Sequence, residues 1–224
     1  MDRRLRNPKN RYFTETDLER ISAAVKKAEG KTSGEIVPFF VPQSDDYEEA
    51  VWRGALTFGG LPLVGLGTLR LFSDYWLFAG VLEISLAFLS ATIFGAFLVH
   101  FLPPVKRFFA GAELLRHRVS QRADQAFLSE EVFKTRDRTG IMIFLSFLER
   151  RVVVLGDSGI NAKVQQQEWD SVVETIVSGM KTGKPAEGLT HAILQCGDLL
   201  QRRGVGRKPG DKDELRDELR VKDK

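Results

Sequence analysis

Three carboxylates stand at the ends of predicted β-strands, where a ligand could reach them. Glu35 opens the apolar run EIVPFFV, Asp137 precedes the run GIMIFLSF, and Asp157 comes shortly after the run RVVVL. Strand ends in α/β sheets commonly bind ligands, and carboxylates together with the carbonyl groups of an Asp-Ser-Gly turn suit a hard cation. The sequence therefore offers a candidate site for Ca²⁺ or Mg²⁺ at these residues.

The same acids also have a purely structural interpretation. Asp157 can cap the helix that follows it and shape the turn, because a side-chain oxygen at that position accepts a helix N–H. Glu35 and Asp137 can simply be solvated. The sequence leaves both interpretations open, and no cofactor is established by it.

Familiar signatures of hydrolytic enzymes are missing. The sequence contains no P-loop, no Asp-x-Asp-x-Thr and no HExxH motif. His100, His117 and His191 are widely separated and do not indicate a metal cluster. We expect His191 on a helix surface, and Cys196 and Trp169 in the core, because both occupy apolar stripes.

The elements around the acids predict an α/β domain. Thr14 caps a helix that Gly30 ends, and the strand 35–41 follows, with Pro38 indicating an edge position. Another helix carries the apolar stripe from 108 to 127, two strands follow, and two helices close the domain near residue 200. Because the strands are apolar throughout, both faces of the sheet need helical cover. The predicted fold is a three-layer α/β/α sandwich.

An apolar segment interrupts this domain. Residues 54–72 contain Arg70 as their one charged residue, and residues 75–102 contain only Glu83 and His100 as acidic or basic residues. About 20 apolar residues suffice for a helix to cross a bilayer. We therefore expect a two-helix transmembrane hairpin, with Glu83 at the headgroups. Two buried core helices are the alternative, but little of the remaining chain could enclose them.

Charge at both ends of the hairpin predicts its orientation. Arg53 precedes the first span, and Lys106 and Arg107 follow the second. Since basic residues flank spans on the cytosolic side, both termini and the α/β domain are expected in the cytosol, at a cell inner membrane. No secretory signal opens the chain, and its single cysteine suits a reducing compartment.

Small residues predict how the two spans pack. Ala87, Ala91 and Gly95 recur every four residues on the second span, and the first span offers Gly59, Gly60, Gly65 and Gly67. Small residues let helix backbones approach closely in lipid. We expect these faces to meet within the hairpin; contact with a second copy of the chain is the alternative.

Composition sets the remaining limits. The net charge of +3 is too weak to indicate a nucleic-acid partner. The predicted organisation is a polar segment at 1–13, the two parts of the α/β domain at 14–52 and 105–201, the hairpin at 53–104, and a charged tail at 202–224 that is expected to be disordered.

With the hairpin removed, the chain resembles the TPM domain family, named after a thylakoid-lumen phosphatase-like protein. The resemblance rests on TSGEIVPFFV, on TRDRTGIMIFLSFLERRVVVLGDSGI and on KPAEGLTHAILQCGDLL. It implies an α/β/α sandwich. It also implies, for some members, acid-phosphatase-like activity with divalent-metal binding, and for others a part in assembling or repairing membrane complexes.

Two functions follow as hypotheses. In the first, the chain is a noncatalytic module, anchored in the lipid bilayer, that binds another membrane protein or associates with itself through the hairpin. In the second, it is a metal-dependent, acid-phosphatase-like hydrolase attached to the membrane. The missing nucleophile signature favours the first.

Overall fold

The computed structural model describes residues 12–72, 81–207 and 214–222, except for the side chains of residues 70–72. The chain forms two compact units. Met1–Ser44 and Arg118–Lys224 make up the first, here called the α/β unit, and Asp45–His117 make up the second, the hairpin unit. The inserted unit therefore extends beyond the predicted 53–104 at both ends.

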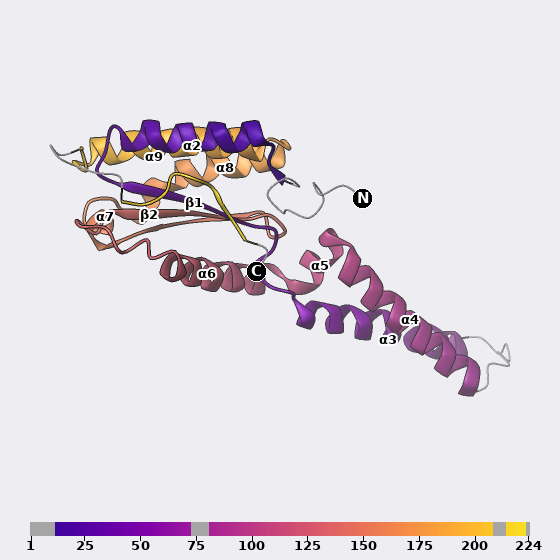
Figure 1. Ribbon diagram of the computed structural model, residues 1–224. Coiled ribbons are helices and arrows are strands. Elements are labelled where there is room, and N and C mark those ends of the chain that lie inside the picture. Colours follow the sequence, from indigo (N-terminus) through magenta and orange to yellow (C-terminus); the bar gives the residue numbers. More distant parts are fainter. Residues whose placement is uncertain (1–11, 73–80, 208–213, 223–224) are drawn as a thin grey trace. The chain divides into compact units, whose positions relative to one another are not determined.

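The α/β unit is built on a mixed sheet (Figure 1). Its strands are β1 (Glu35–Val41), β2 (Gly140–Ser146), β3 (Arg151–Gly156) and β4 (Arg220–Val221), in the order β3-β2-β1-β4. β1 runs parallel to β2 and β4, whereas β3 is antiparallel to β2. The strands predicted from the apolar runs are therefore present, at nearly the predicted positions.

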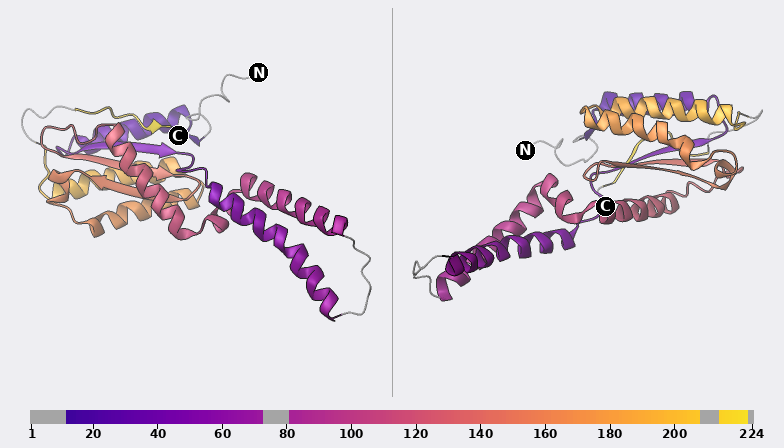
Figure 2. Two further views of the ribbon diagram at one scale, coloured as in Figure 1. Left: turned by 90° about the horizontal axis from the view of Figure 1, so that it is seen from below. Right: turned by 180° about the vertical axis from the view of Figure 1, so that it is seen from behind.

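Helices cover both faces of this sheet, as predicted. α2 (Glu15–Glu29), α8 (Asp170–Lys181) and α9 (Pro185–Arg202) lie on one face, and α6 (Ala112–Ser129) on the other (Figures 1 and 2). Successive side chains of a strand point to opposite faces. Ile36 and Phe40 accordingly pack into the core with α2 and α9, and Val37 and Phe39 into the core with α6. The result is the three-layer α/β/α sandwich.

Local signals set the ends of α2. Thr14 Oγ1 accepts the Asp17 N–H at 3.2 Å, and Asp17 Oδ2 accepts the Thr14 N–H at 2.9 Å. This reciprocal capping box satisfies donors that have no partner within the helix. Gly30 ends the helix. Both predicted ends are confirmed.

Strand β1 lies inside the sheet, although Pro38 predicted an edge strand. β4 is only two residues long and pairs with Phe39 and Phe40, so it leaves the Pro38 position without a strand neighbour on that side. Proline lacks an N–H and is tolerated where the ladder needs none. The prediction of an edge strand was therefore wrong, although Pro38 itself has no strand neighbour on that side to which an N–H would donate.

The charged tail contributes to the sheet, which differs from the expected disorder. Val205 is buried, Gly206 forms a bridge with Thr32, and Leu219 is buried beside β4. Glu130 holds the tail through ion pairs with Arg220 and Lys222, at 3.5 and 2.5 Å. The high charge and the few apolar residues of the tail predicted disorder, but the partners of these charges come from distant parts of the chain.

The N-terminal segment predicted at 1–13 lies outside the described residues except for its last two. The Tyr12 and Phe13 rings each lie 5.0 Å from the ring of Phe40. Phe13 is fully buried. These two aromatic residues therefore belong to the core of the α/β unit.

The hairpin unit contains α3 (Glu48–Phe72), α4 (Val81–Phe101), α5 (Pro103–Ala110) and the start of α6. Gly111, with φ of 79°, separates α5 from α6. An apolar stripe from 108 to 127 predicted one helix there. The spacing of apolar residues could not predict this break, because a single residue with a positive φ causes it, and that conformation favours glycine.

Helices α3 and α4 pack through some of the predicted small residues. A Cβ on Gly95 would lie 2.6 Å from Phe58 Cβ, and a Cβ on Gly59 would lie 2.2 Å from Thr92 Oγ1. Contact within the hairpin is therefore confirmed for these two glycines. Gly60, Gly65 and Gly67 have open space around them, so their predicted role in this contact was wrong.

Among the described residues, one helix is long and apolar enough to cross a membrane. This is α4, with 21 residues and a mean hydropathy of 2.0 over its most apolar window. The predicted first span, within α3, is not confirmed by this criterion. Residues 75–80 of the predicted second span lie outside the described residues. Glu83 is in the first turn of α4 and exposed.

Candidate functional site

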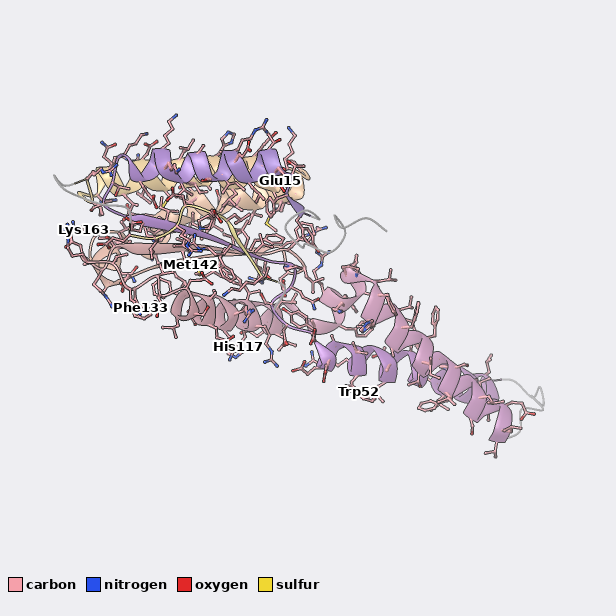
Figure 3. The ribbon with its side chains drawn as sticks, viewed as in Figure 1. Glu15, Trp52, His117, Phe133, Met142 and Lys163 are labelled. Atoms are coloured by element: carbon pink, nitrogen blue, oxygen red, sulfur yellow. The ribbon has the colours of Figure 1, made fainter. Side chains whose placement is uncertain are left out.

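The sheet topology brings the three predicted acids to one end of the sheet. Glu35 pairs with Gly140 at the start of the parallel strands, and Ile141 pairs with Gly156 at the end of the antiparallel β3. Asp157 therefore follows β3 at the end where β1 and β2 begin. Figure 3 labels Phe133 and Lys163 near this end. The acids were predicted at strand ends, and all three lie at the same end of the sheet.

Asp157 is buried and has two neighbours of different kinds. Its Oδ1 accepts the Ser158 N–H at 2.6 Å, which caps the short helix α7 (Ser158–Asn161). Arg138 Nε lies 2.9 Å from Oδ2. That distance makes an ion pair, yet the geometry of a hydrogen bond is not met, and Oδ2 has no hydrogen-bond partner among the described residues. The carboxylate thus depends on the guanidinium for charge balance.

Arg138 is held in place by its own loop. It has a positive φ of 57°, and its Nη1 donates to the Phe133 carbonyl at 3.3 Å. Its guanidinium also lies 5.7 Å from the centre of the Phe133 ring. Such cation–π contacts stabilise a positive charge over a ring face. The arginine is therefore prearranged beside Asp157.

Gly159 allows this loop and the corner to approach closely. A Cβ at position 159 would lie 2.5 Å from the Asp137 carbonyl oxygen and 2.7 Å from that of Arg138. The Gly159 N–H donates to the Arg138 oxygen at 3.0 Å. Only a residue without a side chain fits here, so the Asp-Ser-Gly corner is needed for backbone packing.

The other two acids have separate partners. Glu35 is buried, and its Oε2 accepts the Leu215 N–H at 3.2 Å. Asp137 is 34% exposed and lies 3.8 Å from Arg136 Nε. In the part of the chain that the structure describes, no three His, Cys, Asp or Glu side chains lie together as metal ligands. With Arg138 beside Asp157, the corner does not fit a divalent cation in this arrangement.

At the opposite end of the sheet, a polar cluster forms that the sequence did not predict. Ser146 Oγ donates to Glu149 Oε2 and lies 2.6 Å from Ser44 Oγ, while the Ser44 N–H donates to Glu149 Oε1 at 2.8 Å. Ser146 and Glu149 are buried. Both oxygens of the carboxylate are occupied, so the cluster ties the exit of β1 to the β2–β3 turn.

No local sequence pattern predicts this cluster. Ser44 is separated by 102 residues from Ser146; it follows Gln43 in a polar stretch, whereas Ser146 ends the apolar run GIMIFLS. Glu149 three residues after Ser146 is a weak signal, because the same spacing occurs in many exposed turns. Only the pairing of Val41 with Ser146 brings the three side chains together.

Cys196, Trp169 and His191 lie where they were expected. Cys196 and Trp169 are in the core, and His191 is exposed. Burial, and secondarily the charge of Glu29, raises the pKa of the Cys196 thiol, which therefore stays protonated. Arg202 stands at the Cys-x5-Arg spacing from Cys196, but both residues belong to helix α9. That spacing binds phosphate in a loop, so it has no such role here.

A polar groove of about 540 Å³ runs along α8 and α9. Its walls are mostly small or uncharged, with Ser171, Thr175, Ser178, Gln195 and the exposed His191 among them. The two helices approach closely at Gly179, where a Cβ would lie 2.7 Å from the Gly188 Cα. The groove therefore reflects close helix packing.

Comparison with known proteins identifies part of this architecture. The TPM domain family matches residues 111–199, a segment that contains β2, β3 and most of the helices of the α/β unit, but not β1, α3 or α4. No curated protein matches the sequence. The solved structure of the BA42 protein from the psychrophilic bacterium Bizionia argentinensis is similar in fold. Its TM-score is 0.57 at 20% identity, covering 93% of this chain and 94% of that one.

Proposed function

We propose that this chain is a membrane-anchored TPM-domain protein whose α/β unit is a noncatalytic module that binds another membrane protein. The hairpin unit supplies the anchor, and the α/β unit supplies the binding surface in the cytosol, at a cell inner membrane. This assignment extends the TPM match to the whole chain, because β1 and α2 complete the sandwich that residues 111–199 begin.

The exterior of the hairpin unit is the observation that supports the anchor. In the described chain, the exposed large apolar side chains lie between Trp52 and Phe108, with only Leu128 and Phe147 elsewhere. Trp52 is 68% exposed, and Figure 3 shows it pointing away from the helix pair. Soluble monomers rarely expose contiguous apolar surface on this scale. Insertion into a bilayer would remove this apolar surface from water.

The base of the hairpin supports the proposed orientation. Arg53 Nη1 donates to the carbonyl oxygens of Phe109 and Ala110, both at 3.2 Å. A cation at the end of a helix satisfies carbonyls that have no partner within the helix. Lys106 and Arg107 belong to the same short helix α5. Basic residues thus gather at the base, which the positive-inside rule assigns to the cytosol.

The contacts of the strand-end acids support a noncatalytic, binding role. Asp157 caps α7 and pairs with Arg138, and Glu35 accepts a backbone N–H. These contacts give both residues a place in the fold without a substrate. A domain of this kind, held at the membrane by an internal hairpin, is suited to recognising a protein in the same bilayer.

One purification with two readouts tests the proposal. The tagged full chain is cross-linked in native membranes, solubilised and affinity-purified, and phosphate release from p-nitrophenyl phosphate with Mg²⁺ or Ca²⁺ is measured on the same sample. A stoichiometric membrane-protein partner without phosphate release is expected. The matched control is the variant Asp157→Asn, which should recover the same partner. Metal-dependent phosphate release that Asp157→Asn abolishes would contradict the noncatalytic assignment.

A further inference from the structure

Strand β1 has a long neighbour on one side and a short one on the other. All seven of its residues pair with β2, whereas only Phe39 and Phe40 pair with β4. The Glu35 N–H donates to the Thr139 carbonyl beside β2, and alternate residues of a parallel strand bond to opposite neighbours. The backbone groups of Phe39 therefore face β2, and those of Phe40 face β4.

Backbone hydrogen bonds alone hold β4 weakly. The Lys222 N–H donates to the Phe40 carbonyl at 3.2 Å, and the paired stretch is two residues long. A segment with so few backbone hydrogen bonds opens more readily than the sheet beside it. Side chains must therefore supply most of what keeps residues 214–222 in place.

One carboxylate receives two cations of this segment. Glu130, directly after α6, lies 3.5 Å from Arg220 Nε and 2.5 Å from Lys222 Nζ. The Glu130 and Arg220 side chains are only 18% and 16% exposed, and burial lowers the pKa of Arg220, which the Glu130 carboxylate opposes. Removing one partner of such a pair leaves the other charged and poorly hydrated. The closed position of the segment therefore depends on this pairing.

Apolar side chains occupy the other face of this segment. Leu219 is buried, and Val221 packs against the core that α2 and α9 share. Because successive side chains of a strand point to opposite faces, Arg220 and Lys222 lie together on the side of Glu130. The edge of β1 therefore holds a strand in which apolar and basic residues alternate.

Residues before β4 are attached through single contacts. Glu214 Oε2 accepts the Arg136 N–H at 2.8 Å. Asp217 Oδ2 lies 3.8 Å from Lys26 Nζ, and the Lys26 side chain is 68% exposed. Ion pairs of exposed side chains contribute little to stability. The attachment of residues 214–222 therefore depends mainly on β4 and on the side chains beside it.

We propose that residues 214–222 are a releasable strap. The strap covers the outer edge of β1 until an extended partner segment with the same alternation of apolar and basic residues replaces it. The partner strand takes over the Phe40 carbonyl and the Glu130 carboxylate, in the mode of binding known as β-augmentation. Opening without a partner leaves an unpaired strand edge and an uncompensated carboxylate, so the closed strap is the resting state. This inference rests on the proposed binding function and describes how that function is regulated.

Amide hydrogen exchange of the full chain in detergent micelles tests whether charge holds the strap. The double variant Arg220→Gln/Lys222→Gln should let the Phe40 amide exchange about tenfold faster, because β4 is released, and should leave the Phe39 amide unchanged. Arg216→Gln is the matched control, since this exposed arginine belongs to the same segment and is not one of the two cations paired with Glu130. It should leave both amides as in wild type.

Fluorescence anisotropy of a labelled peptide tests what replaces the strap. The peptide Glu-Leu-Arg-Val-Lys, which copies residues 218–222, should bind the double variant about tenfold more tightly than wild type. The reason is that a site open in a fraction of the molecules binds with an affinity reduced by that fraction. Adding Glu130→Gln should weaken peptide binding to the double variant by about tenfold. Adding Glu131→Gln should not, because Glu131 pairs with Lys134 at the surface.

A Phe40 amide that stays protected in the double variant, or equal peptide affinity for wild type and the double variant, would overturn the strap. Faster exchange at Phe39 as well would do the same, because residues 214–222 would then be a fixed part of the sheet. So would a wild-type dimer that the double variant makes monomeric, since the strap would then pair with a second copy. The proposed function fails separately: if the cross-linked membranes yield no partner for wild type, the module itself is refuted. A partner recovered equally by wild type and the double variant refutes only the strap.

Discussion

The α/β unit and the hairpin unit place their apolar side chains in opposite positions. Ile143 is fully buried between β-strands and helices, whereas Ile93 is 61% exposed on α4. The α/β unit buries its apolar side chains against its sheet, and the hairpin unit leaves many of its own exposed. This difference is what the proposed membrane anchor requires of the second unit.

The largest expected difference concerns these two isoleucines. Ile143→Ala should lower the free energy of unfolding of the α/β unit by about 2–5 kcal/mol, because it leaves a cavity in a packed core. Ile93→Ala should change it by less than about 0.5 kcal/mol, since most of that side chain is exposed. Denaturant unfolding of both variants in detergent, followed by far-UV circular dichroism, checks the contrast. Equal losses would show that Ile93 is in a protein core.

A charge introduced at an exposed position should have the next largest effect, and this effect should differ between the two units. Ile93→Arg places a charge within α4 and should cost about 2.5–3.5 kcal/mol of insertion free energy. Leu128→Arg is the matched control, because Leu128 is 63% exposed and belongs to the α/β unit. Carbonate extraction of membranes should release a larger fraction of the Ile93→Arg protein. If both variants stay equally in the pellet, α4 is not the anchor.

Overpacking the contact between α3 and α4 should have a smaller effect on stability. Gly95→Val forces atoms into Phe58 and the Gly54 carbonyl, and overpacking of this kind costs about 1–3 kcal/mol. Gly67→Val is the control, because Gly67 has open space around it. A cysteine pair at positions 59 and 92, where a Cβ on residue 59 would lie 3.4 Å from Thr92 Cβ, should cross-link more slowly only in Gly95→Val. Slower cross-linking in both variants would indicate a general loss of helix structure.

The smallest effect is expected at Asp157. Asp157→Ala should cost about 1 kcal/mol because it loses the cap of α7, and Asp157→Asn should be nearly silent. Neither cost should depend on Ca²⁺, Mg²⁺ or Mn²⁺ if Arg138 already neutralises the carboxylate. A cation that binds the folded state would instead raise the melting temperature with its concentration. Such a rise, lost in Asp157→Asn, would establish the predicted metal site.

Local sequence signals predicted much of the fold. The strand 35–41, the capping of α2 by Thr14 and Asp17, and the helices on both sides of the sheet follow from periodicity and capping chemistry. β4 could not be predicted, because Arg220 and Lys222 depend on Glu130, some 90 residues away. Gly111 was missed because an apolar stripe continues across it.

The candidate site was predicted less completely than the fold. The strand-end positions of Glu35 and Asp157 followed from the apolar runs. The partner of Asp157 did not, because Arg138 reaches it only through a loop with a positive φ and a close approach at Gly159. The Ser44, Ser146 and Glu149 cluster likewise depends on strand pairing that no local motif encodes.

Spin labels at two matched positions test most directly whether the hairpin faces lipid. Ile93→Cys and Leu128→Cys, each in a Cys196→Ala background, are labelled and the full chain is reconstituted into liposomes. Molecular oxygen concentrates in the hydrocarbon core, and a nickel chelate stays in water. The account predicts that the label at 93 relaxes mainly through oxygen and the label at 128 mainly through nickel, since their exposed fractions are alike at 61% and 63%. Equal nickel access at both positions would contradict the membrane anchor.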